Sequence, residues 1–227
     1  MRHYKLTVSY DGTQYYGWQK QPNRITVEQI LHDSFVTVFR TDCVLSGASR
    51  TDAGVHALGQ VVLLKTELEL DAAKMKFAWN NSLPADIHIS SLKAVDATFN
   101  PYRLVQQKTY WYHFFIDRPL PFCAGHGWYV RKPVSIEKLE QVLQIFVGTH
   151  DFRSFSTGNE RENTVRTIDS IEVKRLKQKN TYRIVVKAPR FLRYMIRRIV
   201  GAAIAASCSD RFSVDHVREV LEKKNPE

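Results

Sequence analysis

The chain has 227 residues, 44% hydrophobic and 25% charged, which suits a globular protein with one large core or two smaller domains. No low-complexity tract interrupts it, so the composition excludes a disordered chain. Thirty-three Lys and Arg against 23 Asp and Glu give a formal charge of +10, which favours a polyanionic partner such as nucleic acid. Charge alone does not separate a nucleic-acid-binding protein from a basic soluble one.

Cysteine spacing and hydropathy indicate the cellular compartment in which the protein works. Cys43, Cys123 and Cys208 are widely separated and form no CxxC pair, so we expect buried, reduced thiols and no metal site. The N-terminus enters an alternating pattern without an apolar signal core, and the most apolar later stretch, residues 199–206, is too short to cross a bilayer. We therefore expect a cytoplasmic protein without membrane contact.

The first half of the chain alternates strand and helix patterns. Apolar residues at every second position predict a strand over residues 3–10. Thr26, with Gln29 in the reciprocal capping-box position, predicts the start of a helix that ends near Arg40. Further patterns predict strands over 43–45, 60–65 and 86–95 and a helix from Asp71 to about residue 80.

The second half repeats this order. We expect a strand over 108–116, a helix from Ser135 to Gly148, strands over 167–175 and 181–187, a helix over 191–206 and a last helix from Ser213. Each half then follows the ferredoxin-like, split βαβ arrangement of an α+β protein, with domains at 1–105 and 106–227. The sequence ends at Glu227, so we expect the second half to lack a closing strand after its helices.

The densest polar segment is the turn-rich run of residues 47–57, Gly-Ala-Ser-Arg-Thr-Asp-Ala-Gly-Val-His-Ala. Small residues let backbone or a planar ligand approach closely. Asp52 stands two residues from Arg50, whose charge favours an ionised carboxylate able to act as a nucleophile or electrostatic stabiliser. The alternative is structural, because an Asp in such a turn also serves as a local cap with a surface Arg partner.

As a whole, Arg-Thr-Asp-Ala-Gly-Val-His at 50–56 resembles the signature of the tRNA pseudouridine synthase A family, with Ser49 where that family has glycine. The resemblance continues across nearly the whole chain. Similar segments are Tyr-Asp-Gly at 10–12, Tyr-Tyr-Gly-Trp-Gln at 15–19, Thr-Val-Glu at 26–28, Gly-Gln-Val-Val at 59–62, Asn-Ser-Leu-Pro-Ala-Asp-Ile at 81–87, Phe-Asn-Pro at 99–101, Asp-Phe-Arg-Ser-Phe at 151–155 and Met-Ile-Arg-Arg-Ile-Val-Gly at 195–201.

The resemblance implies roles for individual residues. Asp52 matches the nucleophilic carboxylate that helps break the N-glycosidic bond of uridine, and Arg50 the arginine that helps displace the target base. Tyr110 matches the tyrosine that stacks on uracil and takes part in late proton transfer. Arg197 matches the arginine that pairs with the catalytic Asp. Gln60, in the matching strand after the loop, is a further candidate substrate contact.

Basic residues near the C-terminus add a candidate RNA surface. On the helix expected over 191–206, Arg190, Arg193 and Arg197 are spaced i, i+3 and i+7, so we expect them to share one face toward RNA. We take Arg190 and Arg193 as candidate substrate contacts. Lys174, Arg175, Lys177 and Lys179 form a second basic cluster, for which phosphate contacts and a solvated hairpin are both open.

The resemblance also implies a fold and an activity. It implies a pseudouridine synthase fold, with a mixed, largely antiparallel sheet, flanking helices and a central cleft. It implies isomerisation of uridine at positions 38, 39 and 40 of the tRNA anticodon stem-loop, by a homodimer without a cofactor. The family's usual closing strand is not present before Glu227, so an inactivated enzyme is one competing hypothesis.

Two further hypotheses concern the class of protein. A non-catalytic RNA-binding protein would also explain the +10 charge and the ferredoxin-like halves. It would not explain why Arg50, Asp52, Tyr110 and Arg197 all stand at matching positions. A carboxylate-dependent hydrolase of nucleosides or glycosides would need a second, paired acid, and none stands out near the loop.

Overall fold

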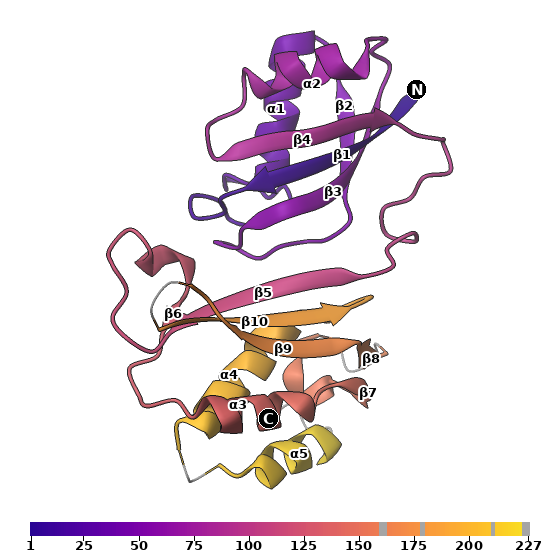
Figure 1. Cartoon of the computed structure of the whole chain (residues 1–227). Coiled ribbons are helices and arrows are strands. Elements are labelled where there is room, and N and C mark those ends of the chain that lie inside the picture. The colour runs from indigo at the N-terminus through magenta and orange to yellow at the C-terminus, as the bar shows by residue number, and fades with distance from the viewer. Residues whose placement is uncertain (159–162, 178–179, 210–211, 224–227) are drawn as a thin grey trace. The chain divides into compact units, whose positions relative to one another are not determined.

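The computed structural model describes residues 1–158, 163–177, 180–209 and 212–223. The chain divides into two compact units, unit 1 over Met1–Val105 and unit 2 over Gln106–Glu227. Both combine helices with mainly antiparallel strands, so the protein is α+β as predicted (Figure 1). None of the helices in the described ranges has the length and apolar character needed to span a bilayer.

Unit 1 is a four-stranded antiparallel sheet in the order β2-β3-β1-β4, the ferredoxin-like order. Its elements follow one another along the chain in the order strand, helix, strand, strand, helix, strand (Figure 1). They are β1 (Arg2–Tyr10), α1 (Val27–Phe39), β2 (Cys43–Gly47), β3 (Ala57–Thr66), α2 (Ala72–Asn80) and β4 (Ile87–Ala94).

The core of unit 1 forms where the apolar face of the sheet meets the helices. Leu6 and Val8 of β1 are fully buried beside Phe35 of α1 and Trp79 of α2. Burying each such side chain contributes about 1.5–3 kcal/mol. At the start of α1, the Thr26 hydroxyl accepts a hydrogen bond from the Gln29 amide. The reciprocal half of the predicted capping box is absent, because the Gln29 side chain bonds Asp33.

Unit 2 carries a second four-stranded sheet, in the order β6-β5-β10-β9, and a separate two-stranded sheet of β7 and β8. The β5-β6 pair is parallel and the other pairs are antiparallel. The elements are β5 (Lys108–Phe115), η1 (Ala124–His126), β6 (Trp128–Tyr129), α3 (Ile136–Gln144), β7 (Gly148–Asp151), η2 (Arg153–Phe155), β8 (Val165–Ile168), β9 (Ser170–Arg175), β10 (Thr181–Ala188), α4 (Met195–Ser207) and α5 (Val214–Lys223).

Helices α3, α4 and α5 supply the core of unit 2, with Phe114, Phe146 and Ile199 fully buried. Among the residues that the structure describes, the edge of β5 away from β10 is paired only at Phe114 and Phe115, by the two residues of β6. Helix α5 ends at Lys223, the last residue that the structure describes, so the predicted lack of a closing strand falls outside the described residues.

Three predicted boundaries in unit 2 are wrong. The helix from Ser135 ends at Gln144, four residues before Gly148, which instead begins β7 with a φ of 104°. The strand expected over 167–175 is two strands, of which β8 pairs with β7 and β9 joins the sheet. The helix expected from residue 191 begins only at Met195, because Tyr194 has left-handed backbone, with φ 58° and ψ 6°.

The late start of α4 overturns the predicted arginine face. Arg190 and Arg193 precede the helix, and only Arg197 lies on it, so the i, i+3, i+7 spacing does not place the three side chains on one helical face. All three are nonetheless exposed. In the second basic cluster, Lys174 and Arg175 end β9, whereas Lys179 lies outside the described residues.

The prediction of three buried thiols is correct for one cysteine only. Cys43 of β2 is buried, whereas Cys123 and Cys208 are partly exposed, and all three are free.

Candidate active site

In unit 1, the loop that carries Asp52 joins β2 to β3 and lies against the segment that follows β1. The amide of Trp18 donates to the carbonyl of Thr51 at 3.1 Å, and the amide of Gly54 donates to the carbonyl of Tyr15 at 3.1 Å. These bonds hold the loop on both sides of Asp52. Within the loop, the Val55 amide donates to the Asp52 carbonyl at 3.2 Å and closes a turn around the aspartate.

Two glycines make this close approach possible. A Cβ atom at Gly17 would lie 2.5 Å from the Thr51 carbonyl oxygen, and Gly17 also has a φ of 88° that favours glycine. A Cβ atom at Gly12 would overlap the Val55 carbonyl. The Tyr-Asp-Gly and Tyr-Tyr-Gly-Trp segments are therefore the backbone platform on which the Asp52 loop rests.

Buried aromatic residues pack beneath the Asp52 loop and hydrogen-bond to it and to its neighbours. Tyr10 bonds the Thr51 hydroxyl through its own hydroxyl at 2.8 Å, and Trp18 is almost fully buried beside it, with ring centroids 6.0 Å apart. The Tyr15 hydroxyl donates to Asp86 at 2.6 Å. Burial first, and then the Asp86 carboxylate, raise the pKa of Tyr15, so it stays a neutral donor. Sequence reasoning missed Tyr15 and Asp86 as supports for the loop.

His56 ties the end of the loop to the turn after β1. Its Nδ1 atom lies 3.1 Å from the Gly12 amide nitrogen and 2.9 Å from Asp11 Oδ1. One nitrogen cannot serve both contacts at once: the neutral ring accepts from Gly12, whereas Nδ1 donates to Asp11 when it carries the proton. Either contact fixes the loop against the turn, so His56 contributes to the structure of the loop.

The candidate residues of unit 1 differ in exposure. Asp52 is half-buried and Arg50 is exposed, so the carboxylate belongs to the anchored part of the loop while the guanidinium extends into solvent. Gln60 is buried, and its side-chain nitrogen donates to the Ser49 carbonyl. Its amide group is thus directed at the backbone of the loop that carries Asp52.

In unit 2, the structure brings most of the remaining candidates to one end of the β5-β10 pair. Tyr110 of β5 lies opposite Val186 of β10, and its ring packs edge-on against Phe191, with centroids 5.0 Å apart. Burial raises the pKa of Tyr112, and the charge of Arg197 opposes that shift, so Arg197 acts on the strand that carries Tyr110.

Lys108 joins this group, and sequence reasoning missed it. Burial lowers the pKa of the Lys108 ammonium, and the nearby charge of Arg190 lowers it further. Lys108 lies opposite Ala188, two residues before Arg190, and precedes Tyr110 by two residues on the same face of β5. The spacing from Tyr110 was the available signal. Arg193 lies beyond this group, with its guanidinium carbon 5.0 Å from the Tyr194 ring centroid.

Similarity to known proteins identifies the family. A family model described as tRNA pseudouridine synthase matches residues 6–101 and 142–227, which include the Asp52 loop and α4. The chain belongs to the tRNA pseudouridine synthase family. Members of this family isomerise uridine in tRNA. The family model does not match residues 102–141, where Tyr110 lies.

Curated members of the family align over almost the whole chain. The tRNA pseudouridine synthase A of Clostridium kluyveri is 35% identical over 99% of this chain and 92% of its own length. Its counterpart in Aquifex aeolicus is 34% identical with the same coverage. The Thermodesulfovibrio yellowstonii enzyme is 32% identical over 96% of this chain and 89% of its own length. These alignments extend through the segment that the family model leaves out.

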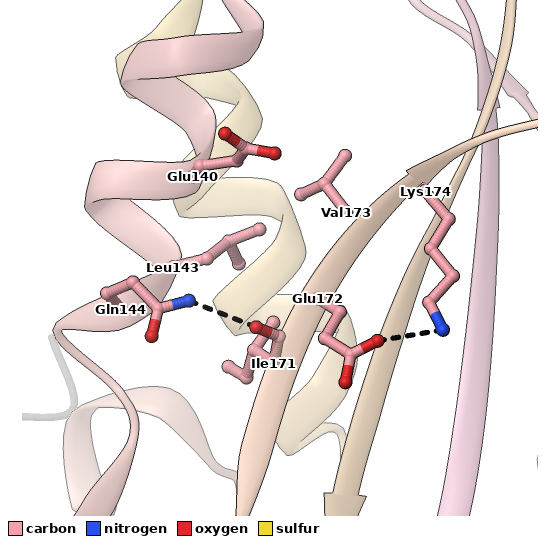
Figure 2. Close-up of a pocket in the computed structure, with 7 residues that line it drawn as sticks. All are labelled: Glu140, Leu143, Gln144, Ile171, Glu172, Val173 and Lys174. Carbon is pink, nitrogen blue, oxygen red and sulfur yellow. Dashed lines mark hydrogen bonds and ion pairs between the residues drawn. The ribbon is translucent and has the colours of Figure 1, made fainter.

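A pocket of about 460 Å³ lies elsewhere in unit 2, between α3 and the edge strand β9 (Figure 2). Gln144 of α3 donates to the Ile171 carbonyl at 3.0 Å, and Lys174 pairs with Glu172 at 2.8 Å. These contacts cover exposed backbone and add charge at the sheet edge, which discourages pairing with another strand. The lining contains none of the candidate site residues, so we assign this pocket to edge protection.

Proposed function

We propose that this chain isomerises uridine to pseudouridine in the anticodon stem-loop of tRNA, at positions 38, 39 and 40, with Asp52 as the catalytic carboxylate. The observation that carries the proposal is the Asp52 loop itself. Its sequence matches the family signature, and backbone hydrogen bonds on both sides hold it on a glycine platform. Such preorganisation allows one carboxylate to be presented to a substrate in a fixed geometry.

The reaction conserves every atom and electron. The bond from ribose C1′ to uracil N1 breaks, the base rotates, and a bond from C1′ to C5 forms; the proton lost from C5 is balanced by one gained at N1. Because nothing is oxidised or reduced, the proposed mechanism uses no cofactor. Asp52 assists cleavage of the glycosidic bond, as its nucleophilic character allows.

Three further side chains complete the proposed site. Tyr110 stacks on the displaced uracil, and its hydroxyl takes part in the late proton transfer. Arg197, exposed on α4, takes the role of the arginine that the family resemblance assigns to the catalytic aspartate. Arg50 occupies the space that the target base leaves, which offsets part of the few kcal/mol needed to extrude a base. The exposure of Arg50 supports this role, since a side chain that enters RNA must be able to reach it.

Arg190 and Arg193 are proposed RNA contacts, and Gln60 a proposed substrate contact. The two arginines are exposed and precede α4, on the segment that leads to Arg197, so they suit contacts to the phosphate backbone. For Gln60, the bond to Ser49 favours an indirect contribution, by which Gln60 steadies the loop that meets the nucleotide. We also propose a homodimer and a cytoplasmic location, which the family resemblance and the reduced cysteines support.

The test is incubation with unmodified tRNA transcripts, followed by mapping of pseudouridine at single-nucleotide resolution. We expect product at positions 38 to 40 with the wild-type chain and none with Asp52→Asn. A non-catalytic RNA-binding protein would bind the transcript without forming product in either case. Product elsewhere in the tRNA would contradict the anticodon assignment while leaving the isomerase activity intact.

A further inference from the structure

The sheet of unit 2 has one face directed away from its helices, here called the outer sheet face. Side chains alternate along each strand, and Phe114, Ile184 and Ile171 point into the core with α3 and α4. The neighbouring residues on each strand therefore point outward. The outer sheet face comprises Thr109, Trp111, His113 and Phe115 of β5, Thr181, Arg183, Val185 and Lys187 of β10, and Ser170, Glu172 and Lys174 of β9.

Three side chains at the centre of this face are fixed against one another. The guanidinium carbon of Arg183 lies 3.8 Å from the ring centroid of Trp111, close enough for a cation–π contact. The Arg183 Nε atom donates to His113 Nε2 at 2.8 Å. Arg183 lies directly opposite His113 in the register and diagonal to Trp111, so the strands themselves bring the three together.

This cluster keeps a large aromatic surface in solvent. Trp111 is 45% exposed, whereas Phe115 and Val185 on the same face are buried. The topology does not require a tryptophan here, because the equivalent outward positions of β1 in unit 1 are His3, Lys5, Thr7 and Ser9. An exposed indole, held by an arginine that is itself oriented by a histidine, is better explained by binding than by folding.

The charge of the face indicates the kind of partner. Arg183, Lys174 and Lys187 oppose a single acid, Glu172, among the outward side chains of these strands. Glu172 is already committed, since its contact with Lys174 holds its pKa below the usual range (Figure 2). Lys174 is committed to the same contact, so Arg183 and Lys187 supply the positive charge for an anionic partner.

We propose that the outer sheet face binds an unpaired nucleotide of the tRNA substrate, with its base stacked on Trp111 and its phosphate near Arg183 and Lys187. Aromatic side chains on a sheet surface stack bases regardless of sequence, and neighbouring cations follow the backbone. The inference rests on the proposed function for the identity of the RNA. It adds a contact to a nucleotide that does not react.

The experiment measures affinity for unmodified tRNA transcript in the Asp52→Asn background, so that the RNA is not converted during binding. Trp111→Ala should weaken binding about tenfold, and Trp111→Phe should restore it to within about threefold, because phenylalanine keeps a stacking face. Trp128→Ala is the matched control, since Trp128 is similarly exposed, at 40%, but lies on β6. It should bind as tightly as the parent.

Two further readouts separate a binding role from a structural one. With Asp52 intact, Trp111→Ala should raise KM for tRNA and leave kcat at saturating tRNA unchanged. Arg183→Ala should also lower the dependence of log K on log salt by about one unit or less, as expected for loss of one phosphate contact. If Trp111→Ala folds poorly, tRNA-induced quenching of tryptophan fluorescence tests the contact between tRNA and Trp111 instead. The fluorescence of the wild type should then show a quenched component that Trp111→Phe lacks.

The outcomes distinguish this inference from the proposed function. Suppose that the wild type forms pseudouridine. If Trp111→Ala then binds tRNA as tightly as Trp128→Ala does, the outer sheet face is wrongly assigned and the proposed function stands. The same holds if Trp111→Phe keeps the full tRNA-induced quenching. If the wild type neither binds tRNA nor forms pseudouridine, the proposed function itself is wrong.

Discussion

The two units share the order of three strands, β2-β3-β1 in unit 1 and β9-β10-β5 in unit 2, and differ in how the first strand of each is covered. In unit 1, β4 pairs with β1 from Tyr4 to Tyr10, so both edges of β1 are bonded over most of its length. In unit 2, β6 pairs with β5 only at Phe114 and Phe115. A complete ferredoxin-like sheet supports the Asp52 loop, whereas the partly covered strand carries Tyr110 and the exposed Trp111.

The comparison shows two ways of holding a candidate site. Unit 1 fixes its loop by backbone packing against Gly12 and Gly17, where added atoms have no room. Unit 2 supports the start of β5 by side chains: Tyr110 packs on Phe191, and the charge of Arg190 acts on Lys108. An added Cβ should therefore be costly at Gly12 and Gly17 of unit 1 and mild at Gly125 and Gly201 of unit 2.

Among the changes that compare the two units, the largest effect is expected from Gly12→Ala. The new Cβ would overlap the Val55 carbonyl, so the loop must shift, at a cost of about 1–3 kcal/mol. A displacement of about 1 Å at Asp52 would lower the rate of isomerisation about 100-fold. Urea denaturation and single-turnover assays measure the two effects.

The control is Gly125→Ala in unit 2, where an added Cβ meets nothing within 4 Å. Its stability should stay within about 0.5 kcal/mol of the wild type. Equal behaviour of the two variants would contradict the view that the Asp52 loop rests on Gly12.

An effect of intermediate size on stability is expected at alkaline pH, from the Cys43 thiol of unit 1. Burial, with a smaller effect of Asp42, raises the pKa of the Cys43 thiol from 9.0 to about 12. The neutral thiol is thus favoured in the folded state, so its contribution is complete below pH 9 and is lost as pH rises toward 12. Stability should fall by up to about 1.4 kcal/mol per pH unit in this window.

Urea denaturation between pH 7 and pH 10.5 tests this window, with Cys43→Ala as the comparison. Cys43→Ala should show a shallower decline above pH 9, even if it is less stable at neutral pH. Tyr15 adds a decline of the same sign above pH 10, because its pKa is also raised in the fold. Parallel curves for the wild type and Cys43→Ala would show that the thiol does not titrate as described.

The smallest effect is expected from Gly201→Ala on α4. An added Cβ there meets nothing within 4 Å, and alanine is the better helix former by about 1 kcal/mol. The melting temperature of unit 2 should rise slightly. If stability instead falls, α4 is packed more tightly at this position than the structure shows.

The sequence predicted the elements of unit 1 closely because its signals are local. Alternation defined β1, and Thr26 and Asp71 both cap helices as expected. The fold class and the family were likewise predictable from motifs that span the chain. The anchoring of the Asp52 loop was not, since the contacts of Tyr15 with Asp86 join residues far apart in sequence.

Unit 2 was harder to predict because tertiary context overrides local pattern there. Tyr194 adopts a left-handed conformation that no glycine or asparagine signals, and α4 therefore begins later than the periodicity of residues 191–206 indicates. Asp169 interrupts a continuous strand pattern, and β8 leaves the sheet to pair with β7. The outer sheet face was equally hidden, since the contacts of Arg183 with Trp111 and His113 depend on the pairing of distant strands.

The central claim concerns the carboxylate of Asp52, and the most direct measurement is the single-turnover rate of pseudouridine formation by Asp52→Asn. Asparagine has nearly the same shape and keeps the loop, but it cannot act as the nucleophile. We expect unchanged affinity for tRNA and no detectable product. Pseudouridine formed at the wild-type rate, with tRNA fully bound, would contradict the account.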